Sequence, residues 1–159
     1  MIVVDATVVA AFLFPADEFH SAAMAVHSKD ADWHCPELVF SEIRSVALKH
    51  HRKGDTLDSI IARSNLTAAA VSVYRMHSHS VLLAAVEGSL SAYDAEYVAL
   101  ARQLAVRLVT TDEKVLLAFP SLAMRPEDFV KNLIGAVIEV LCQPTSAAHI
   151  RHFLTIGPM

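Results

Sequence analysis

Short apolar runs alternate with longer amphipathic stretches along the chain. The runs have the length and the β-branched or alternating character of strands, and they cover residues 1–4, 71–74, 107–110 and 122–124. Apolar residues at helical spacing predict helices over residues 7–14, 17–26, 36–52, from 56 onward, 81–86, 91–104, 112–119 and from 126 onward. Strands alternating with helices predict a three-layer α/β/α fold around a central, mainly parallel twisted sheet of four to five strands.

Composition narrows the class of protein. The 159 residues suit one domain with one core, and a hydrophobic content of 54% argues against disorder. No apolar run reaches the ~20 residues that a bilayer span needs, and Asp5 interrupts the first run too early for a signal peptide, so we expect a cytoplasmic protein with no membrane partner. Cys35 and Cys142 lack the spacing of a metal or redox site, and we interpret both as packing residues.

Charge and glycine usage exclude several functions. The net charge of −4 is not that of a polycation that binds nucleic acid through bulk electrostatics, so any such contact is local or bridged by metal. The four glycines are too scattered for a phosphate-binding loop or a dinucleotide fingerprint, and the serine-hydrolase motif GxSxG is absent from the sequence.

Three aspartates lie where strands end or helices begin. Asp5 directly follows the first predicted strand, and Asp112 follows the run at 107–110. In open α/β sheets, ligands gather outside the carboxyl ends of the strands. Asp94 falls three residues after Ser91, which is also the pattern of a capping box. Each aspartate could therefore serve only as a helix cap, and position alone does not decide between a cap and a ligand site.

Glu42 breaks the pattern of its helix. Leu38, Val39 and Val46 lie three or four residues away and place the carboxylate on the apolar side of the helix. Burying an ionised carboxylate costs several kcal/mol unless a cation or hydrogen bonds compensate. The cations of the same helix point outward, so a metal is the better partner. Carboxylate oxygens are the ligands that Mg²⁺ and Mn²⁺ prefer, and such an ion would relieve the repulsion between these acids.

The order and local settings of the four acids resemble those of the PIN-domain family. The matching stretches are Ile2–Thr7, Pro36–Ile43, Ser91–Ala101 and Leu108–Asp112. Compact chains of this kind resemble VapC-type toxins of toxin–antitoxin pairs, and the resemblance covers residues 1 to about 131. It implies a PIN-like nuclease domain over residues 1–131 and a C-terminal extension of unknown role over residues 132–159.

The resemblance also implies an activity, a cofactor and partners. It implies an endoribonuclease that hydrolyses RNA with Mg²⁺ or Mn²⁺, forms a homodimer and is inhibited by a small cognate antitoxin. Its catalytic and metal residues match Asp5, Glu42, Asp94 and Asp112 here. We assign Asp5 and Asp94 as direct metal ligands, while Glu42 and Asp112 complete the site through water or a second metal.

Three other positions bear on this resemblance. Thr110 matches the family's hydroxyl residue beside the last acid and is expected to position a phosphate or the water, and Thr7 matches a small polar position near the first acid. Ala6 departs from the usual Ser or Thr, which puts one supporting hydrogen bond in doubt.

Two features have ordinary explanations beside a functional one. The cations of residues 49–53 end the helix that carries Glu42, as the helix dipole favours, although they could also contact an RNA backbone. Tyr93, Tyr97 and Leu100 repeat at helical spacing and indicate core or a dimer interface rather than a base-stacking surface.

Three other functions remain open on the sequence. A PIN nuclease that processes RNA without being a toxin is one, although little sequence is left for a further RNA-binding module. A catalytically inactive PIN-like scaffold that binds a protein is another, but it need not keep a costly buried Glu42. An unrelated phosphatase or response-regulator-like domain would want paired acids near the first strand and a lysine near the last one, and neither is evident.

Overall fold

The computed structural model describes residues 1–131, so the predicted extension 132–159 and Cys142 lie outside the described residues. The strands are β1 (Ile2–Val4), β2 (Trp33–Pro36), β3 (Ser72–Tyr74), β4 (Leu108–Val109) and β5 (Ala123–Met124). The helices are α1 (Ala6–Leu13), α2 (His20–Lys29), α3 (Val39–Arg52), α4 (Leu57–Ala70), α5 (Ser78–Gly88), α6 (Ala92–Leu104) and α7 (Glu113–Ala118), and residues 126–131 are also helical.

The strands form one five-stranded sheet in the order β3-β2-β1-β4-β5, and every neighbouring pair is parallel. The chain builds outward from β1 through β2 to β3, then crosses to the other side of β1 with β4. Strand order therefore reverses between β1 and β4, where Val3 lies opposite Leu108. A crevice at such a reversal is where open α/β sheets bind ligands.

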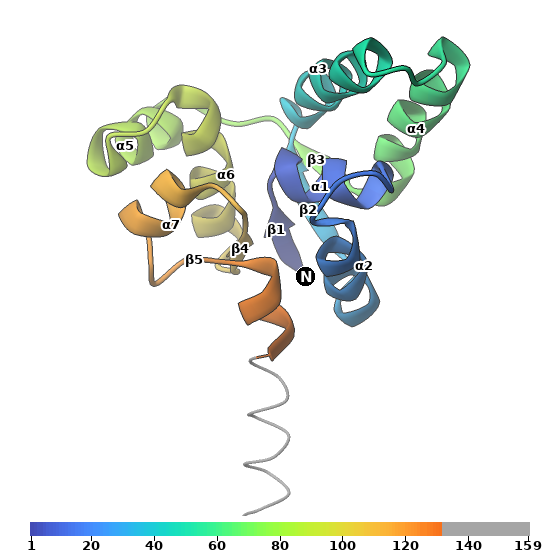
Figure 1. Cartoon of the computed structure of the whole chain (residues 1–159). Helices are drawn as coiled ribbons and strands as arrows, with labels where there is room; N and C mark the ends of the chain where they lie inside the picture. Colours follow the sequence, from blue (N-terminus) through green and yellow to red (C-terminus); the bar gives the residue numbers. More distant parts are fainter. Residues whose placement is uncertain (132–159) are drawn as a thin grey trace, which may run out of the picture.

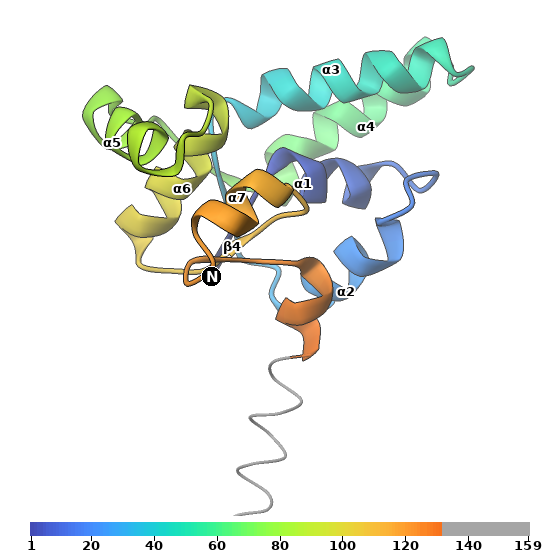
Figure 2. The same cartoon turned by 60° about the vertical axis from the view of Figure 1, so that its left-hand side comes forward.

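Helices cover both faces of the sheet. Figures 1 and 2 show α5 and α6 on one side, and α1, α3 and α4 on the other. Helix α6 packs directly on β1, β2 and β4, while α1 contacts α2, α3 and α4. Figure 2 also shows α3 and α4 running together as a pair above the sheet. The predicted three-layer α/β/α architecture with a parallel sheet of four to five strands is confirmed.

The core lies where α1 and α6 sandwich the central strands. Val3, Val4, Leu108 and Val109 are fully buried, which explains why β1 and β4 are continuous apolar runs rather than alternating ones. Burial of one such side chain contributes about 1.5–3 kcal/mol. Cys35 is also buried and its thiol donates to the carbonyl of Val4 at 3.1 Å, as its interpretation as a packing residue requires.

Strand β2 was missed by the sequence analysis. Trp33 was placed in a loop and Pro36 in the first turn of a helix, whereas both lie in β2 and α3 begins at Val39. The apolar/polar pattern of Trp-His-Cys-Pro has no β-branched residue to mark a strand. Pro36 is tolerated because it ends the strand, where Glu37 takes over and donates its N–H to the carbonyl of Tyr74 at 2.9 Å.

Helix α2 begins later than the sequence predicted. The expected span of 17–26 becomes His20–Lys29. The carboxylate of Asp17 accepts the N–H of Phe19 at 2.9 Å, so it stabilises the turn before the helix. Among residues 1–131, no helix is both long and apolar enough to span a membrane.

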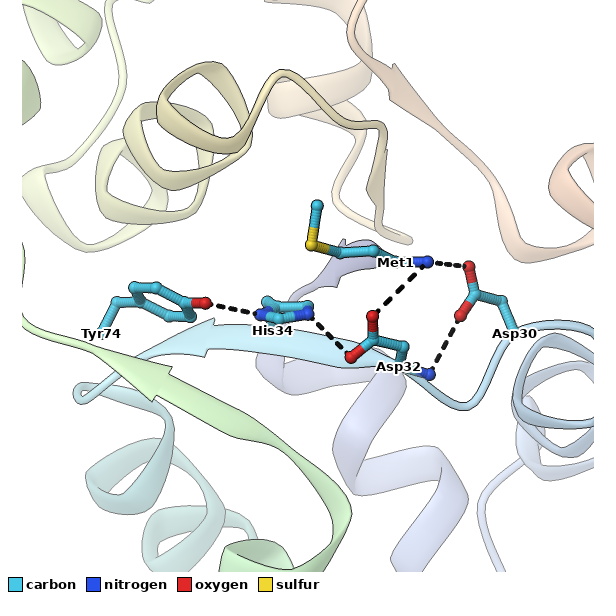
Figure 3. Close-up of polar contacts among 5 residues, drawn as sticks. All are labelled: Met1, Asp30, Asp32, His34 and Tyr74. Atoms are coloured by element: carbon cyan, nitrogen blue, oxygen red, sulfur yellow. Dashed lines mark hydrogen bonds and ion pairs between the residues drawn. The ribbon is translucent and has the colours of Figure 1, made fainter.

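A polar network links the N-terminal amine to residues of β2 and β3 (Figure 3). The N-terminal amine of Met1 pairs with Asp30 at 2.6 Å and with Asp32 at 3.8 Å. The buried ring of His34 bonds the carboxylate of Asp32 at 2.9 Å through Nε2 and the hydroxyl of Tyr74 at 3.0 Å through Nδ1. The contacts of Met1 lie at the end of the sheet opposite Asp5, while Tyr74 reaches His34 from the carboxyl end of β3.

Candidate active site

Asp5 lies at the carboxyl end of β1 and is the N-cap residue of α1. Its Oδ1 accepts hydrogen bonds from the backbone N–H groups of Thr7 at 2.8 Å and Val8 at 3.2 Å, and from the hydroxyl of Thr7. Its Oδ2 accepts from the hydroxyl of Thr110. Asp5 is therefore a helix cap, as the ordinary interpretation holds, and it is also a carboxylate only 8% exposed at the edge of the sheet.

Thr110 joins the first acid to the last. It is fully buried after β4, its hydroxyl donates to Asp5, and the same oxygen accepts the N–H of Asp112 at 2.9 Å. Its own N–H donates to the carbonyl of Met124 at 3.0 Å. The side chain of Thr110 is thus held between Asp5 and Asp112, and its expected role in positioning a phosphate or the water stays a prediction.

Asp112 is also a helix cap, and Asp94 is the partner of one. Asp112 caps α7 by accepting the N–H groups of Lys114 at 2.7 Å and Val115 at 3.3 Å. Ser91 caps α6, accepting the N–H of Asp94 at 3.2 Å and donating its hydroxyl to the Asp94 carboxylate at 2.7 Å. Both carboxylates stay half-buried beside the reversal point of the sheet. The capping role and a role in a site are thus compatible.

Glu42 enters from α3, in the first turn of that helix. Its carboxylate accepts a hydrogen bond from the hydroxyl of Tyr97 on α6 at 2.5 Å. From the sequence, a metal is the expected partner of this half-buried acid. In the structure the partner is Tyr97, whose aromatic body is buried in the core as its helical spacing predicted.

The four predicted acids surround one small cavity. It has a volume of about 50 Å³, and its lining includes Asp5, Thr7, Glu42, Asp94, Tyr97 and Asp112. These residues come from α1, α3, α6 and the loop after β4. The fold therefore brings together acids that are more than 100 residues apart in the sequence.

The acids influence one another's protonation. Burial raises the pKa of Asp5, and hydrogen bonds from Thr110 and neighbouring groups offset only part of that rise. Burial also raises the pKa of Glu42 against the hydrogen bond from Tyr97, and the charges of Asp5 and Asp94 add to the rise. Negative charge is therefore unfavourable here without a cation.

The donor set fits a hard divalent ion. All four acids offer oxygen ligands, and a cavity of about 50 Å³ exceeds the roughly 10–15 Å³ that one water requires. Within the part of the chain that the structure describes, no three Asp, Glu, His or Cys side chains are grouped closely enough to hold an ion as they stand. The carboxylates bond to hydroxyl and N–H groups, so holding an ion requires the acids to approach one another while these partners orient them.

Comparison with known proteins decides the family. The PIN domain model matches residues 2–120. This chain belongs to the PIN-domain family. The match covers every residue that lines the acidic cavity, and it excludes the phosphatase or response-regulator alternative.

One curated relative and one solved structure are similar to this PIN domain. Ribonuclease VapC3 of Pyrobaculum aerophilum is 30% identical over 129 residues, which are 76% of this chain and 96% of that protein. The predicted membership of the VapC-type branch is thus confirmed. The crystal structure of PAE2754 from Pyrobaculum aerophilum superposes with a TM-score of 0.64 at 24% identity, covering 84% of this chain and 96% of that one. This second likeness shows the fold alone.

Tyr97 is the site residue of this PIN domain that the sequence analysis did not assign. Its spacing of three from Asp94 puts both side chains on one face of α6, which is the signal that was available. Thr7 has a larger part than expected, because its backbone and its hydroxyl both bond to Asp5. It thereby supplies the supporting hydrogen bond that Ala6 cannot.

Proposed function

We propose that this PIN domain is a metal-dependent endoribonuclease and the toxin of a type II toxin–antitoxin pair. The observation that carries the proposal is the single cavity lined by Asp5, Glu42, Asp94 and Asp112 at the reversal point of the sheet. The similarity to Ribonuclease VapC3 supports RNA as the substrate. The cognate antitoxin, the homodimer and the cytoplasmic location are parts of the same proposal.

Asp5 and Asp94 would hold Mg²⁺ or Mn²⁺ directly, and Glu42 and Asp112 would complete the site through water or a second ion. When bound, the metal supplies the positive charge that lowers the pKa of a water and offsets charge on the phosphate. The reaction is hydrolysis of a phosphodiester, in which the water oxygen attacks phosphorus while the bond to the leaving ribose oxygen breaks.

The chain's own residues prepare the site for this reaction. The hydroxyls of Thr7 and Thr110 hold the Asp5 carboxylate from two sides, and the Tyr97 hydroxyl holds Glu42. Such partners fix the orientation of ligating carboxylates, and losing one typically costs 10–100-fold in metal affinity or activity. The walls of the cavity are apolar on the side of Leu108, which strengthens electrostatic interactions inside.

An inactive scaffold is the alternative of a different class. Burial raises the pKa of both Asp5 and Glu42, so keeping these carboxylates in the cavity costs free energy. An inactive scaffold has no reason to retain acids at that cost. A processing nuclease that is not a toxin shares the proposed chemistry. The toxin is favoured because this chain spans 96% of the length of a VapC relative.

The test is cleavage of labelled total tRNA and ribosomal RNA by the full-length protein in Mg²⁺ and Mn²⁺. Cuts at discrete positions are expected, and EDTA or Asp5→Asn should abolish them. Asp58→Asn, an equivalent change at an exposed position in α4, should cleave like the wild type. Cleavage by Asp5→Asn at the wild-type rate would overturn the assignment of the site.

The toxin role has its own test. Co-expression with the product of a short reading frame directly upstream should yield a stable complex without nuclease activity. Full nuclease activity in the presence of every neighbouring gene product would contradict the toxin role and support a nuclease that is not part of a toxin–antitoxin pair.

A further inference from the structure

A groove leads away from the acidic cavity along one face of α3. It has a volume of about 390 Å³ and shares Ala6, Thr7 and Glu42 with the acidic cavity. Its α3 lining follows helical spacing through Ser41, Ser45, Val46 and Lys49. At a rise of about 1.5 Å per residue, Lys49 lies about 10 Å along the helix axis from Glu42.

Lys49 is the cationic group of this groove. It is exposed, and within residues 1–131 neither Asp nor Glu forms an ion pair with it. The helix dipole accounts for cations anywhere in the last turn of α3, but it does not account for which of them faces the groove. His50 instead stacks on Phe14 and pairs with Asp55, and Arg52 lines neither cavity.

Tyr93 forms the opposite wall. It lies in the first turn of α6, one residue before Asp94, and it is 64% exposed. The sequence analysis grouped it with core or interface residues, but its neighbour Tyr97 on the same helix is the buried one. An exposed aromatic ring at a groove offers a surface on which a base can stack whatever its sequence.

The groove ends beyond Lys49. A second hollow of about 300 Å³ continues past Val46 and Lys49, and Asp17 and Glu18 line it together with His50 and Lys53. The two carboxylates there offset the charge of the two lysines, so the part of the path with an uncompensated cation runs from Tyr93 past the acids to Lys49.

We propose that this groove binds single-stranded RNA beside the cleaved bond, with Lys49 contacting a backbone phosphate and Tyr93 stacking on an unpaired base. The proposal rests on the proposed ribonuclease function and adds the side chains that hold the RNA beside the cleaved bond. A base can reach Tyr93 only when it is outside a base-paired stack, so loops and single strands are taken and duplexes are not. A protein chain could also fill a groove of this size, but continuity with the acids and a free cation favour RNA.

The test is binding of a fluorescent single-stranded oligoribonucleotide of mixed sequence by the full-length protein. Ca²⁺ replaces Mg²⁺ and Mn²⁺, so that carboxylate charge is offset by a hard cation while binding is measured by anisotropy. The wild type should bind the single strand at least tenfold more tightly than the same strand in a duplex. Equal affinity for both forms would overturn the proposal.

Two variants distinguish a specific role of Lys49 in the groove from a general effect of positive charge on RNA binding. Lys49→Ala should weaken binding about fivefold and reduce the slope of log affinity against log salt by about 0.7, as expected for one lost phosphate contact. Arg52→Ala, which removes the same charge from the same helix end outside the groove, should bind like the wild type. Equal losses in the two variants would overturn the assignment of Lys49.

The tyrosine is tested in the same way. Tyr93→Leu should weaken binding on the order of tenfold, and Tyr93→Phe should retain affinity because the ring is kept. Wild-type affinity in Tyr93→Leu would overturn the stacking role. Unchanged RNA binding in both the lysine and the leucine variants would reject the proposal and leave the groove to a protein chain.

Cleavage of tRNA and ribosomal RNA separates this proposal from the nuclease function. Wild-type cleavage by Lys49→Ala and Tyr93→Leu, together with loss in Asp5→Asn, would refute the groove while the nuclease stands. Binding that depends on Lys49 and Tyr93, without cleavage by any form of the protein, would uphold the groove while the nuclease function fails.

Discussion

At the scale of residues, three of the four acids of the cavity accept a hydrogen bond from a hydroxyl group. Asp5 accepts from the hydroxyl of Thr110, Glu42 from that of Tyr97, and Asp94 from that of Ser91. A hydrogen bond from a hydroxyl to a carboxylate is stronger than one to a neutral acceptor, because the carboxylate is charged. Such bonds also leave further oxygen lone pairs available, which a divalent ion requires.

Tyr97→Phe tests one of these donors. The change should destabilise the fold by roughly 1.5 kcal/mol, because a hydrogen bond to a charged group is lost, and it should lower RNA cleavage about tenfold. Thermal unfolding and initial cleavage rates measure the two effects. Tyr74→Phe removes a hydroxyl from the bond to His34; neither residue lines the acidic cavity, so the change should leave cleavage unchanged. A Tyr97→Phe protein with full activity would show that Glu42 needs no such support.

The part of the site that could be predicted from the sequence was the part with local signals. Asp5, Asp94 and Asp112 follow strand ends or cap signals, and Glu42 is conspicuous on an apolar helix face. The bond between Glu42 and Tyr97 could not be predicted, because it depends on how α3 and α6 sit across the sheet, which periodicity does not determine. The buried position of Thr110 likewise follows from tertiary packing.

At the scale of elements, the N-termini of three helices have two roles: they cap the helix, and they hold the acids of the cavity in position. Asp5, Ser91 and Asp112 cap α1, α6 and α7. Asp5 and Asp112 line the acidic cavity, and Ser91 bonds to Asp94, which also lines it. Capping fixes the backbone of each acid, so the carboxylates are held at set positions before any ligand binds. The N-terminal ends of these helices also carry partial positive charge, which favours anionic groups nearby.

Ser91→Ala tests the double use of a cap. It should cost about 1 kcal/mol of stability through loss of the cap, and it should lower cleavage about tenfold because Asp94 loses its hydroxyl donor. Thr56→Ala removes the equivalent cap of α4, away from the acids. The control should lose similar stability and no activity. Equal activity in both variants would mean that Ser91 acts only as a cap.

The elements themselves were predicted unevenly. Strands with β-branched residues and helices with strong caps were located to within a few residues, whereas β2 was missed. Trp33 is the one strand-favouring residue of β2 and does not mark a strand alone, so β2 forms because β1 and β3 pair with its two edges. Such non-local pairing overrides local preference.

At the scale of the whole molecule, strand order creates the site. The reversal between β1 and β4 brings Asp5 beside Thr110 and Asp112, and α3 and α6 add Glu42 and Asp94 from the two layers. The sequence predicted a parallel sheet with acids at its carboxyl edge. It could not predict which strands are neighbours, because several orders satisfy the same pattern of elements.

The buried acids make stability depend on pH. The folded-state pKa of Asp5 is raised above the unfolded value of about 3.9, so the folded protein binds the proton more tightly, and stability is lost as pH rises through that window. In EDTA, the melting temperatures of wild type and Asp5→Asn should converge near pH 4, and the variant should be the more stable at pH 7. Mn²⁺ should raise the melting temperature of the wild type alone. A wild-type melting temperature that increases relative to that of Asp5→Asn as pH rises would contradict this account.

The most direct measurement is binding of Mn²⁺ to the full-length protein, followed by electron paramagnetic resonance of the free ion. We predict that the wild type and Asp58→Asn bind Mn²⁺, and that Asp5→Asn and Asp94→Asn each bind it at least tenfold more weakly. Equal binding by all four proteins, or binding by none of them, would contradict the claim that these acids form a metal site.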